Sequence, residues 1–300
     1  MTKTKNHFQK KRIKDMIFCG IVLAVPVTQF FIFYIVVNFN SILMAFQKYD
    51  KGEFVFNGLQ NFRDMWAEIL HGSTLDALKN SLIVYICSSL LGLTLSLVFS
   101  FYIYKKMPFS KTFRVFLYLP SILSSMVTVT IFKQLVEIGV KNLFSLQEGL
   151  LQNPDTKMGT LMFFQLLMGF GTQILMYSGA MNGIDDSAVE AARLDGVNTF
   201  QEFFHITLPL IYPTIVTFLV VGMAGMYTNQ LNLYAFYGNG SNLGSEYWTV
   251  GYMLFQRINT AKTLSAYPLL ATYGVALTLI AAPMTLLFRK GLEKFGPSID

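Results

Sequence analysis

Charged residues divide the sequence into long apolar stretches separated by shorter polar ones. Six stretches contain no Asp, Glu, Lys or Arg: 16–47, 80–104, 115–132, 158–184, 203–245 and 263–288. A helix needs roughly 20 apolar residues to cross a bilayer, and isolated strands cannot satisfy their backbone in lipid. The pattern predicts an all-α integral membrane protein with six transmembrane helices within 16–288. The stretch 115–132 is short and contains Pro120, and 16–47 is longer than one crossing needs.

Composition and charge agree with a membrane protein and give it an orientation. The 300 residues are 53% hydrophobic and 13% charged, whereas a soluble domain is about 25% charged. Basic residues crowd the chain just before the first apolar stretch: Lys3, Lys5, Lys10, Lys11, Arg12 and Lys14. Such a cluster favours a cytoplasmic N-terminus, so residues 1–15 and the tail 289–300 are both expected in the cytoplasm. No basic face that would bind nucleic acid is visible.

One polar segment, residues 185–209, stands out between the fourth and fifth apolar stretches. Its sequence is DDSAVEAARLDGVNTFQEFFHITLP. Ser187 with Glu190, and Thr199 with Glu202, each have the spacing of a capping box that starts a helix. Gly196 lies between them, and glycine tolerates the left-handed conformation that ends a helix. We therefore expect two short helices joined by a sharp turn, on the cytoplasmic side.

The sequence contains no evident energy source of its own. No charged residue lies deep inside a predicted span, whereas proton-coupled transporters place such groups there. The chain also lacks the phosphate-binding loop of a nucleotide-binding protein, and its three histidines and two cysteines have no metal-ligand spacing. An uphill transporter with this sequence would need a partner chain to supply energy, and no metal site or cofactor in this chain is expected.

The 185–209 segment resembles the EAA loop of permease subunits from ATP-binding-cassette importers. The matching residues are Glu190, Ala191, Ala192, Gly196, Ile206, Leu208 and Pro209. In that family the loop forms a coupling helix that docks in a groove of an ATPase subunit. The resemblance implies that ATP and Mg²⁺ bind to a partner ATPase dimer and that this chain is not an enzyme.

Residue chemistry within the segment is compatible with docking. Ala188, Ala191 and Ala192 form a small-residue face that lets another surface approach closely. Glu190 and Arg193 have the spacing of a helical ion pair. Asp195 and Glu202 are expected to remain free to meet a basic groove. The alternative is that Glu190 only caps its helix and Gly196 only ends it.

The N-terminal half is similar to the carbohydrate-uptake branch of these permeases. The similar stretches are FFIFYIVVNFNSILMAFQKYD (30–50) and NGLQNF (57–62). A maltose-transporter-like, MetI-like fold is implied, in the cytoplasmic membrane of a prokaryote. The resemblance also implies a second homologous permease, an extracytoplasmic solute-binding protein, and a sugar or oligosaccharide as solute.

Amide and aromatic side chains in spans four and five are candidates for binding a neutral sugar. They are Gln173, Tyr177, Tyr227, Asn229, Gln230 and Asn232. Gln173 and Tyr177 are four residues apart and share one helical face. Polar side chains at membrane depth also serve as contacts between helices, and this alternative applies to each of the six.

Three other functions remain open at the level of sequence. The EAA loop also occurs in permeases for other solutes, such as amino acids or polyol phosphates. A secondary transporter or channel working alone is disfavoured by the absence of charge within the spans. A membrane enzyme would need a nucleophile–base pair or a metal cluster at one depth, and the sequence offers neither.

Overall fold

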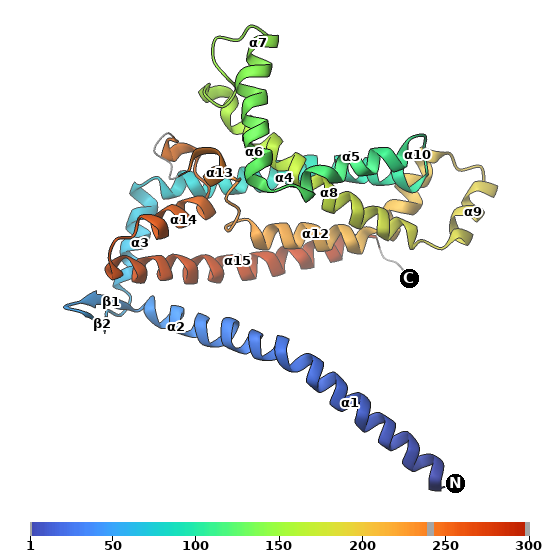
Figure 1. Ribbon diagram of the computed structural model, residues 1–300, viewed down its shortest axis with the longest axis horizontal. Helices are drawn as coiled ribbons and strands as arrows, with labels where there is room; N and C mark the ends of the chain where they lie inside the picture. The colour runs from blue at the N-terminus through green and yellow to red at the C-terminus, as the bar shows by residue number, and fades with distance from the viewer. Residues whose placement is uncertain (1, 239–242, 298–300) are drawn as a thin grey trace. The chain divides into compact units, whose positions relative to one another are not determined.

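The apolar stretches fold into helices long enough for a bilayer crossing (Figure 1). The computed structural model describes the backbone of residues 2–238 and 243–297. It also describes the side chains in those ranges, except the side chains of residues 2–13, His71 and Arg193. Among these residues, four helical segments are long and apolar enough to cross a membrane: Lys14–Met44, Thr74–Tyr104, Pro154–Asn182 and Leu264–Phe295. They coincide with the first, second, fourth and sixth predicted stretches, which confirms those helices.

Contacts divide the chain into two units. The first contains the chain up to Ala67 together with Ala261–Ala276, and the second contains Glu68–Thr260 and the chain from Leu277 onward. The elements up to the start of the second unit are α1 (Thr2–Phe30), π-helix η1 (Phe31–Val36), α2 (Val37–Met44), β1 (Gln47–Asp50), β2 (Glu53–Phe56) and α3 (Gln60–His71). Helix α15 (Tyr267–Phe295) follows the 3₁₀ turn η5 (Leu264–Ala266) and continues from the first unit into the second.

A β-hairpin in the first unit departs from the all-α prediction. Strands β1 and β2 pair antiparallel with Gln47 opposite Phe56. Lys51 and Gly52 have φ angles of 48° and 97°, and two positive φ angles are typical of the tight turns that join such strands. The Asn61 side-chain amide donates to the carbonyls of Ala45 (2.9 Å) and Gln47 (2.7 Å), which fixes the start of α3 beside the hairpin.

The second unit is a bundle of helices around α4 and α8. Its elements are α4 (Thr74–Tyr104), α5 (Ser110–Ile122), α6 (Ser125–Gln134), π-helix η2 (Leu135–Val140), α7 (Lys141–Leu143), α8 (Pro154–Asn182), α9 (Asp186–Leu194), α10 (Thr199–Glu202), π-helix η3 (Phe203–Thr207), α11 (Leu208–Leu210), α12 (Tyr212–Gly225), α13 (Leu233–Tyr237), 3₁₀ turn η4 (Ser245–Tyr247) and α14 (Val250–Thr260). Helices α4 and α8 pack side by side (Figure 1).

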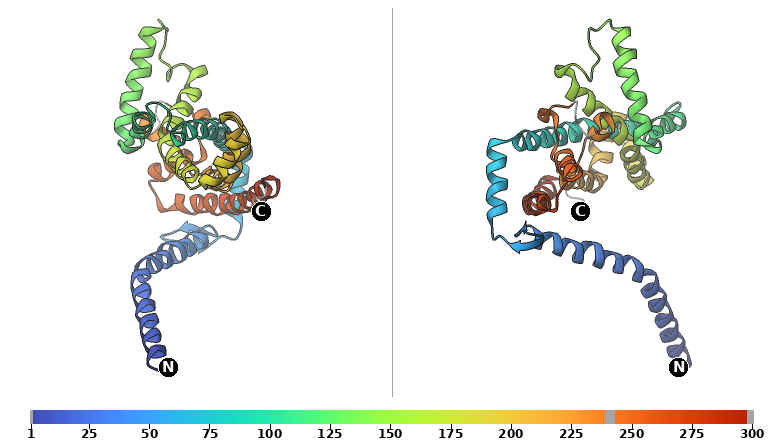
Figure 2. Two further views of the ribbon diagram at one scale, coloured as in Figure 1. Left: turned by 90° about the vertical axis from the view of Figure 1, so that its right-hand side faces the viewer. Right: turned by 60° about the vertical axis from the view of Figure 1, so that its left-hand side comes forward.

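The third and fifth predicted spans are not continuous helices. Ser110–Ile122 and Ser125–Leu143 meet at 105°, and Figure 2 shows α6 leaving the bundle at this point. The break follows Pro120, and Leu123 and Ser124 have extended ψ angles of 150° and 134°. Thr199–Leu210 and Tyr212–Gly225 meet at 65°. Each bent pair has the apolar character of one span, so the described residues supply between four and six crossings.

Two apolar clusters stabilise the second unit. One contains Phe132, Phe164 and Phe236 from α6, α8 and α13, with their ring centroids 5.0–6.2 Å apart. The other contains Leu97, Tyr177 and Phe203 and lies where the 185–209 segment meets α4 and α8. The second cluster therefore anchors the end of that segment to the helices that precede it.

Candidate functional site

The first helix of the 185–209 segment starts two residues earlier than the predicted capping box requires. The Asp185 carboxylate accepts a hydrogen bond from the Ser187 backbone N–H at 3.0 Å. Ser187 lies inside α9, so the predicted Ser187–Glu190 box is wrong, because Asp185 occupies the capping position. Hydrogen bonding from the Ser187 backbone, aided by its side chain, lowers the pKa of Asp185.

Gly196 ends α9 as the sequence predicts. Its φ angle is +80°, and the Val197 N–H donates to the Ala192 carbonyl at 3.1 Å. This six-to-one hydrogen bond with a left-handed glycine is the Schellman motif. Nothing lies within 4 Å of the position that a Cβ of residue 196 would take, so backbone conformation alone selects glycine here.

The second helix begins with Asn198 rather than with Thr199. The Asn198 side chain accepts from the Gln201 N–H at 2.9 Å, and the Gln201 side chain accepts from the Asn198 N–H at 3.0 Å. This reciprocal pair is a capping box shifted by one residue from the prediction. The shift leaves Glu202 available for another partner.

That partner is Lys105, at the C-terminal end of α4. Lys105 Nζ lies 2.5 Å from Glu202 Oε1 and 2.6 Å from Oε2. Only 11% of the Lys105 side chain and 4% of the Glu202 side chain are exposed. The prediction that Glu202 is free to meet an external basic groove is therefore wrong. The two residues are 97 positions apart, and no local pattern in the sequence connects them.

The remaining predicted residues of the segment divide into an exposed and an inward set. Glu190, Ala191, Asp195 and Gly196 are exposed, and Ala192 is buried. The Arg193 side chain lies outside the described residues, so its pairing with Glu190 stays a prediction. Ile206, Leu208 and Pro209 are half-buried in η3 and α11.

Two apolar side chains of the segment project outward, which the motif does not indicate. Leu194 is 89% exposed and Phe200 is 72% exposed. A hollow of about 480 Å³ lies beside the turn and is lined by Ala192, Asp195, Gly196, Val197, Gln201, His205 and Ile206. The turn thus presents two exposed apolar side chains beside a concave surface, and exposed apolar patches mark interaction sites.

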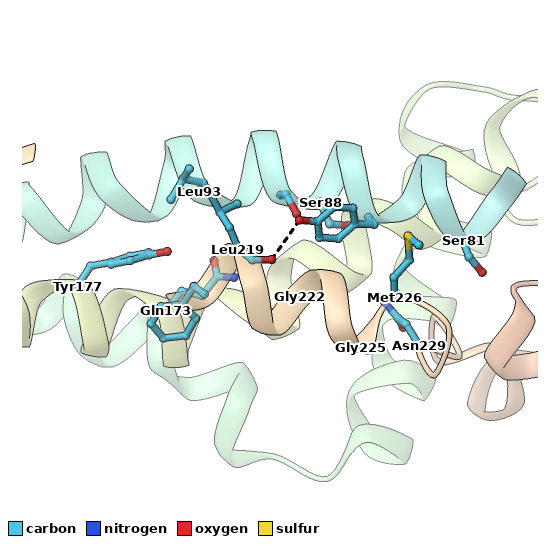
Figure 3. A pocket seen from close by; sticks show the side chains of 13 residues that line it. Ser81, Ser88, Leu93, Gln173, Tyr177, Leu219, Gly222, Gly225, Met226 and Asn229 are labelled. Carbon is cyan, nitrogen blue, oxygen red and sulfur yellow. Dashed lines mark hydrogen bonds between the residues drawn. The ribbon is translucent and has the colours of Figure 1, made fainter. Parts of the chain in front are cut away.

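A second candidate site is a polar cleft of about 150 Å³ between α4, α8 and the end of α12 (Figure 3). It brings together three of the predicted residues, Gln173, Tyr177 and Asn229. Tyr227, Gln230 and Asn232 do not line it. Asn232 instead donates to Gln165 at 2.9 Å, in the manner of a contact between elements.

Helix α4 contributes the polar wall of the cleft, which sequence reasoning missed. Its lining residues are Ser81, Tyr85, Ser88 and Ser89. Their spacing of three to four places them on one helical face, and this polar stripe within an apolar helix is the signal that could have identified them.

Several hydrogen-bonding groups of the cleft have no partner among the described residues. Ser88 Oγ is buried and unpaired. Gln173 Oε1 accepts from Ser96 at 2.9 Å, and Asn229 Oδ1 accepts from the Leu231 N–H at 2.9 Å. These bonds fix the two amides by their oxygens, so their nitrogens remain available as donors. A buried polar group without a partner is costly, and a polar ligand would remove that cost.

Asn229 lies on irregular backbone rather than within a helix. Helix α12 ends at Gly225, and α13 starts at Leu233. The Asn229 carbonyl accepts from the Thr249 hydroxyl at 2.7 Å. Gly251 packs directly against this backbone, because a Cβ there would lie 2.6 Å from the Thr228 carbonyl carbon.

The chain belongs to the family described as binding-protein-dependent transport system inner membrane component, which matches residues 89–290. It is 26% identical over 239 residues to the arabinooligosaccharides transport system permease protein AraP of Bacillus subtilis (strain 168), covering 77% of this chain and 75% of AraP.

Two further similarities concern a shorter segment and the fold. The chain is 27% identical over 124 residues to the maltose/maltodextrin transport system permease protein MalF of Salmonella typhimurium, covering 39% of this chain but 24% of MalF. It superimposes with a TM-score of 0.74 on a chain of a bacterial ABC transporter involved in the import of the acidic polysaccharide alginate. That match has 18% identity and covers 95% of this chain and 99% of the other, so it supports the fold alone.

Proposed function

We propose that this chain forms one half of the translocation pathway of an ATP-driven importer for a sugar or oligosaccharide. The observation that carries the proposal is the 185–209 segment, whose Schellman turn holds exposed Leu194 and Phe200 beside a concave surface. The partners are a second homologous permease, an ATPase dimer that binds ATP and Mg²⁺, and an extracytoplasmic solute-binding protein. The complex lies in the cytoplasmic membrane of a prokaryote.

The proposed topology assigns one crossing to the bent pair of α5 and α6 and one to α12 with the chain that follows it, which gives six spans with the four long helical segments. Both termini and the 185–209 segment are then cytoplasmic. Helices α8 and α12 flank the segment in sequence and also line the polar cleft. Closure of the ATPase dimer moves the segment, and the attached helices carry the motion to the cleft, which opens alternately to the two sides of the membrane.

Leu194 provides a direct test of docking. Burial of a leucine side chain contributes about 1.5–3 kcal/mol, so Leu194→Glu is expected to weaken ATPase association roughly 10- to 100-fold. The measurement is the amount of ATPase that co-purifies with the tagged chain in detergent. Leu143→Glu is the matched control, because Leu143 is 77% exposed on α7. Equal loss of ATPase from both variants, or from neither, would contradict docking at the turn.

The proposed solute class rests on the chemistry of the cleft and on the two relatives named for sugar transport. The cleft combines hydroxyl groups, two amides and the aromatic rings of Tyr85 and Tyr177 without a charged side chain in its lining. Neutral polyhydroxyl compounds match such donors, acceptors and ring faces.

Reconstitution tests the function as a whole. The complex, with its ATPase, partner permease and binding protein, would be placed in proteoliposomes and offered arabino-oligosaccharides, maltodextrins, alginate oligosaccharides, amino acids and polyol phosphates. We expect at least one oligosaccharide to stimulate ATP hydrolysis and to accumulate inside. If only amino acids or only polyol phosphates stimulated ATP hydrolysis, the importer would belong to that solute class instead of the sugar class. Uptake by the purified chain without any ATPase would establish a secondary transporter or channel instead.

Asn229→Ala tests contact between the cleft and the solute in the same assay. Loss of one hydrogen bond to a neutral ligand costs about 0.5–1.5 kcal/mol. The concentration of oligosaccharide that gives half-maximal stimulation should therefore rise roughly 2- to 10-fold. Asn182→Ala is the control, because that amide donates to the Ser178 carbonyl and lies away from the cleft. An unchanged solute dependence in Asn229→Ala would assign Asn229 to packing.

A further inference from the structure

The 185–209 segment has two covalent connections to the pore helices, and both are breaks in regular structure. Helix α8 ends at Asn182, and a short turn through Gly183 leads to α9. At the other end, the chain bends by 65° around Ile211 before α12 begins. A segment held only at these two points could pivot on them, and a push from the ATPase would then be absorbed by the turns.

The ion pair between Lys105 and Glu202 adds a charged side-chain connection beside the apolar contacts that Phe203 makes with α4 and α8. Lys105 follows α4 directly, and Glu202 ends α10. Both carboxylate oxygens lie within 2.6 Å of the same ammonium group. The pair therefore joins the 185–209 segment to a helix with which it has no covalent connection nearby.

Aromatic rings enclose the pair and keep it out of water. Lys105 Nζ lies 5.7 Å from the centre of the Phe101 ring and 5.8 Å from that of Tyr104. The Phe101 and Phe203 rings are 4.8 Å apart. Separating the two charges would leave each of them poorly solvated, and an unpaired buried charge is strongly unfavourable. The pair is thus built to stay closed while the segment moves.

Helix α4 is also the helix that supplies the polar wall of the cleft. Ser81, Tyr85, Ser88 and Ser89 lie on the same continuous helix, which ends at Tyr104 directly before Lys105. A rigid helix transmits displacement of one end along its length. Motion imposed on Glu202 therefore reaches the cleft through α4, in addition to the routes through α8 and α12.

We propose that Lys105 and Glu202 form a clamp that makes the 185–209 segment and α4 move as one body, so that the nucleotide state of the ATPase sets the accessibility of the polar cleft. The proposal rests on the proposed coupling function. Lys105 and Glu202 are positioning residues: they contact neither the solute nor the nucleotide. Their role is to prevent the segment from pivoting at Gly183 and Ile211.

Accessibility of the cleft can be measured without knowing the solute. The chain has two cysteines, Cys19 and Cys87, which are replaced by serine, and Ser89→Cys is introduced as a reporter in the cleft. The complex is purified with its own ATPase and placed in lipid nanodiscs. The reporter is labelled with a methanethiosulfonate reagent in the nucleotide-free state and in the state trapped with ADP and vanadate.

With the clamp intact, we expect the labelling rates of the two states to differ at least tenfold. In Glu202→Gln the difference should fall to within twofold, while ATPase content and vanadate inhibition of ATP hydrolysis stay unchanged. Exchange of the charges, Lys105→Glu with Glu202→Lys, should restore most of the difference. A merely structural role for the residues would not produce this loss and recovery with a bound, vanadate-sensitive ATPase. Lys105→Gln provides a second single variant if the Glu202→Gln chain itself fails to fold and accumulate in the membrane.

A matched control breaks an ion pair elsewhere. Glu293→Gln removes the partner of Arg289 in α15, where the two side chains are 59% and 50% exposed, and it should leave the tenfold difference intact. Retention of the difference in both Glu202→Gln and Lys105→Gln would overturn the clamp. So would a failure of the charge exchange to restore the difference. Loss of the ATPase from Glu202→Gln would also overturn it, since the pair would then serve docking. No difference in the parent reporter protein would overturn the proposed function, and the clamp with it.

Discussion

Replacing Gly196 with proline is expected to abolish solute-stimulated transport while leaving the chain in the membrane. Gly196 has a φ angle of +80°, whereas proline fixes φ near −65°, so the turn that orients α9 and α10 cannot form. Alanine can adopt the left-handed conformation at a cost of about 1–2 kcal/mol. Gly196→Ala should therefore retain part of the activity, and Gly196→Asn more, since asparagine tolerates this conformation better.

Uptake, membrane abundance and ATPase co-purification are measured together for these variants. Gly291→Ala in α15 is the control, because a Cβ there meets nothing within 4 Å and its φ angle is not positive.

Glu190→Lys reverses an exposed charge on α9 and is expected to uncouple transport in the same way. Normal uptake and normal co-purification in both Gly196→Pro and Glu190→Lys would refute coupling through this segment.

Gly251→Ala is expected to destabilise the protein and disturb the cleft at the same time. The added Cβ would lie 2.6 Å from both the carbonyl carbon and the oxygen of Thr228, and 2.8 Å from the Asn229 oxygen. These are backbone atoms, so the irregular chain between α12 and α13 must shift. Overpacking of this kind costs about 1–3 kcal/mol. We expect a lower Tm, together with a higher oligosaccharide concentration for half-maximal stimulation of ATP hydrolysis.

Gly169→Ala in α8 separates this effect from the general effect of adding a methyl group. Nothing lies within 4 Å of a Cβ at residue 169, so both the Tm and the solute dependence should remain close to those of the parent. If Gly251→Ala had the same Tm and the same solute dependence as Gly169→Ala, the backbone of Thr228 and Asn229 would not be held in the position described. Other residues would then have to line that side of the cleft.

The long helices were predictable because one physical property fixes them. Charged residues are excluded from the hydrocarbon core, and the gaps between them therefore marked α4, α8, α15 and the first helical segment. The left-handed end at Gly196 was predictable because glycine tolerates this conformation and because helix-start signals lie on both sides of it in the sequence. Gln173, Tyr177 and Asn229 could be grouped by their chemistry as candidates for one site, and they do line one cleft.

The structural features that the sequence did not predict depend on contacts between distant residues, or on competition between neighbouring residues for the same role. Asp185 and Asn198 cap their helices ahead of Ser187 and Thr199, since several capping residues stand side by side and packing decides among them. The break at Leu123 and the irregular chain after Gly225 both lie within stretches that contain no Asp, Glu, Lys or Arg, so the charge pattern that marked the spans gives no sign of them. Lys105 and Glu202 meet only because α4 and the segment are folded together.

The length of α12 limits how the pore can move. Its 14 residues span about 21 Å, whereas the hydrocarbon core is about 30 Å thick. Irregular backbone through Asn229 must complete the proposed crossing, and such backbone is tolerated at membrane depth only when protein or water shields it from lipid. Two of its polar groups are satisfied internally: the Asn229 carbonyl accepts from the Thr249 hydroxyl, and the Leu231 N–H donates to the Asn229 side chain. In the proposed transport cycle α12 can therefore tilt or slide together with Thr249 and Gly251, whereas rolling about its own axis would break these contacts.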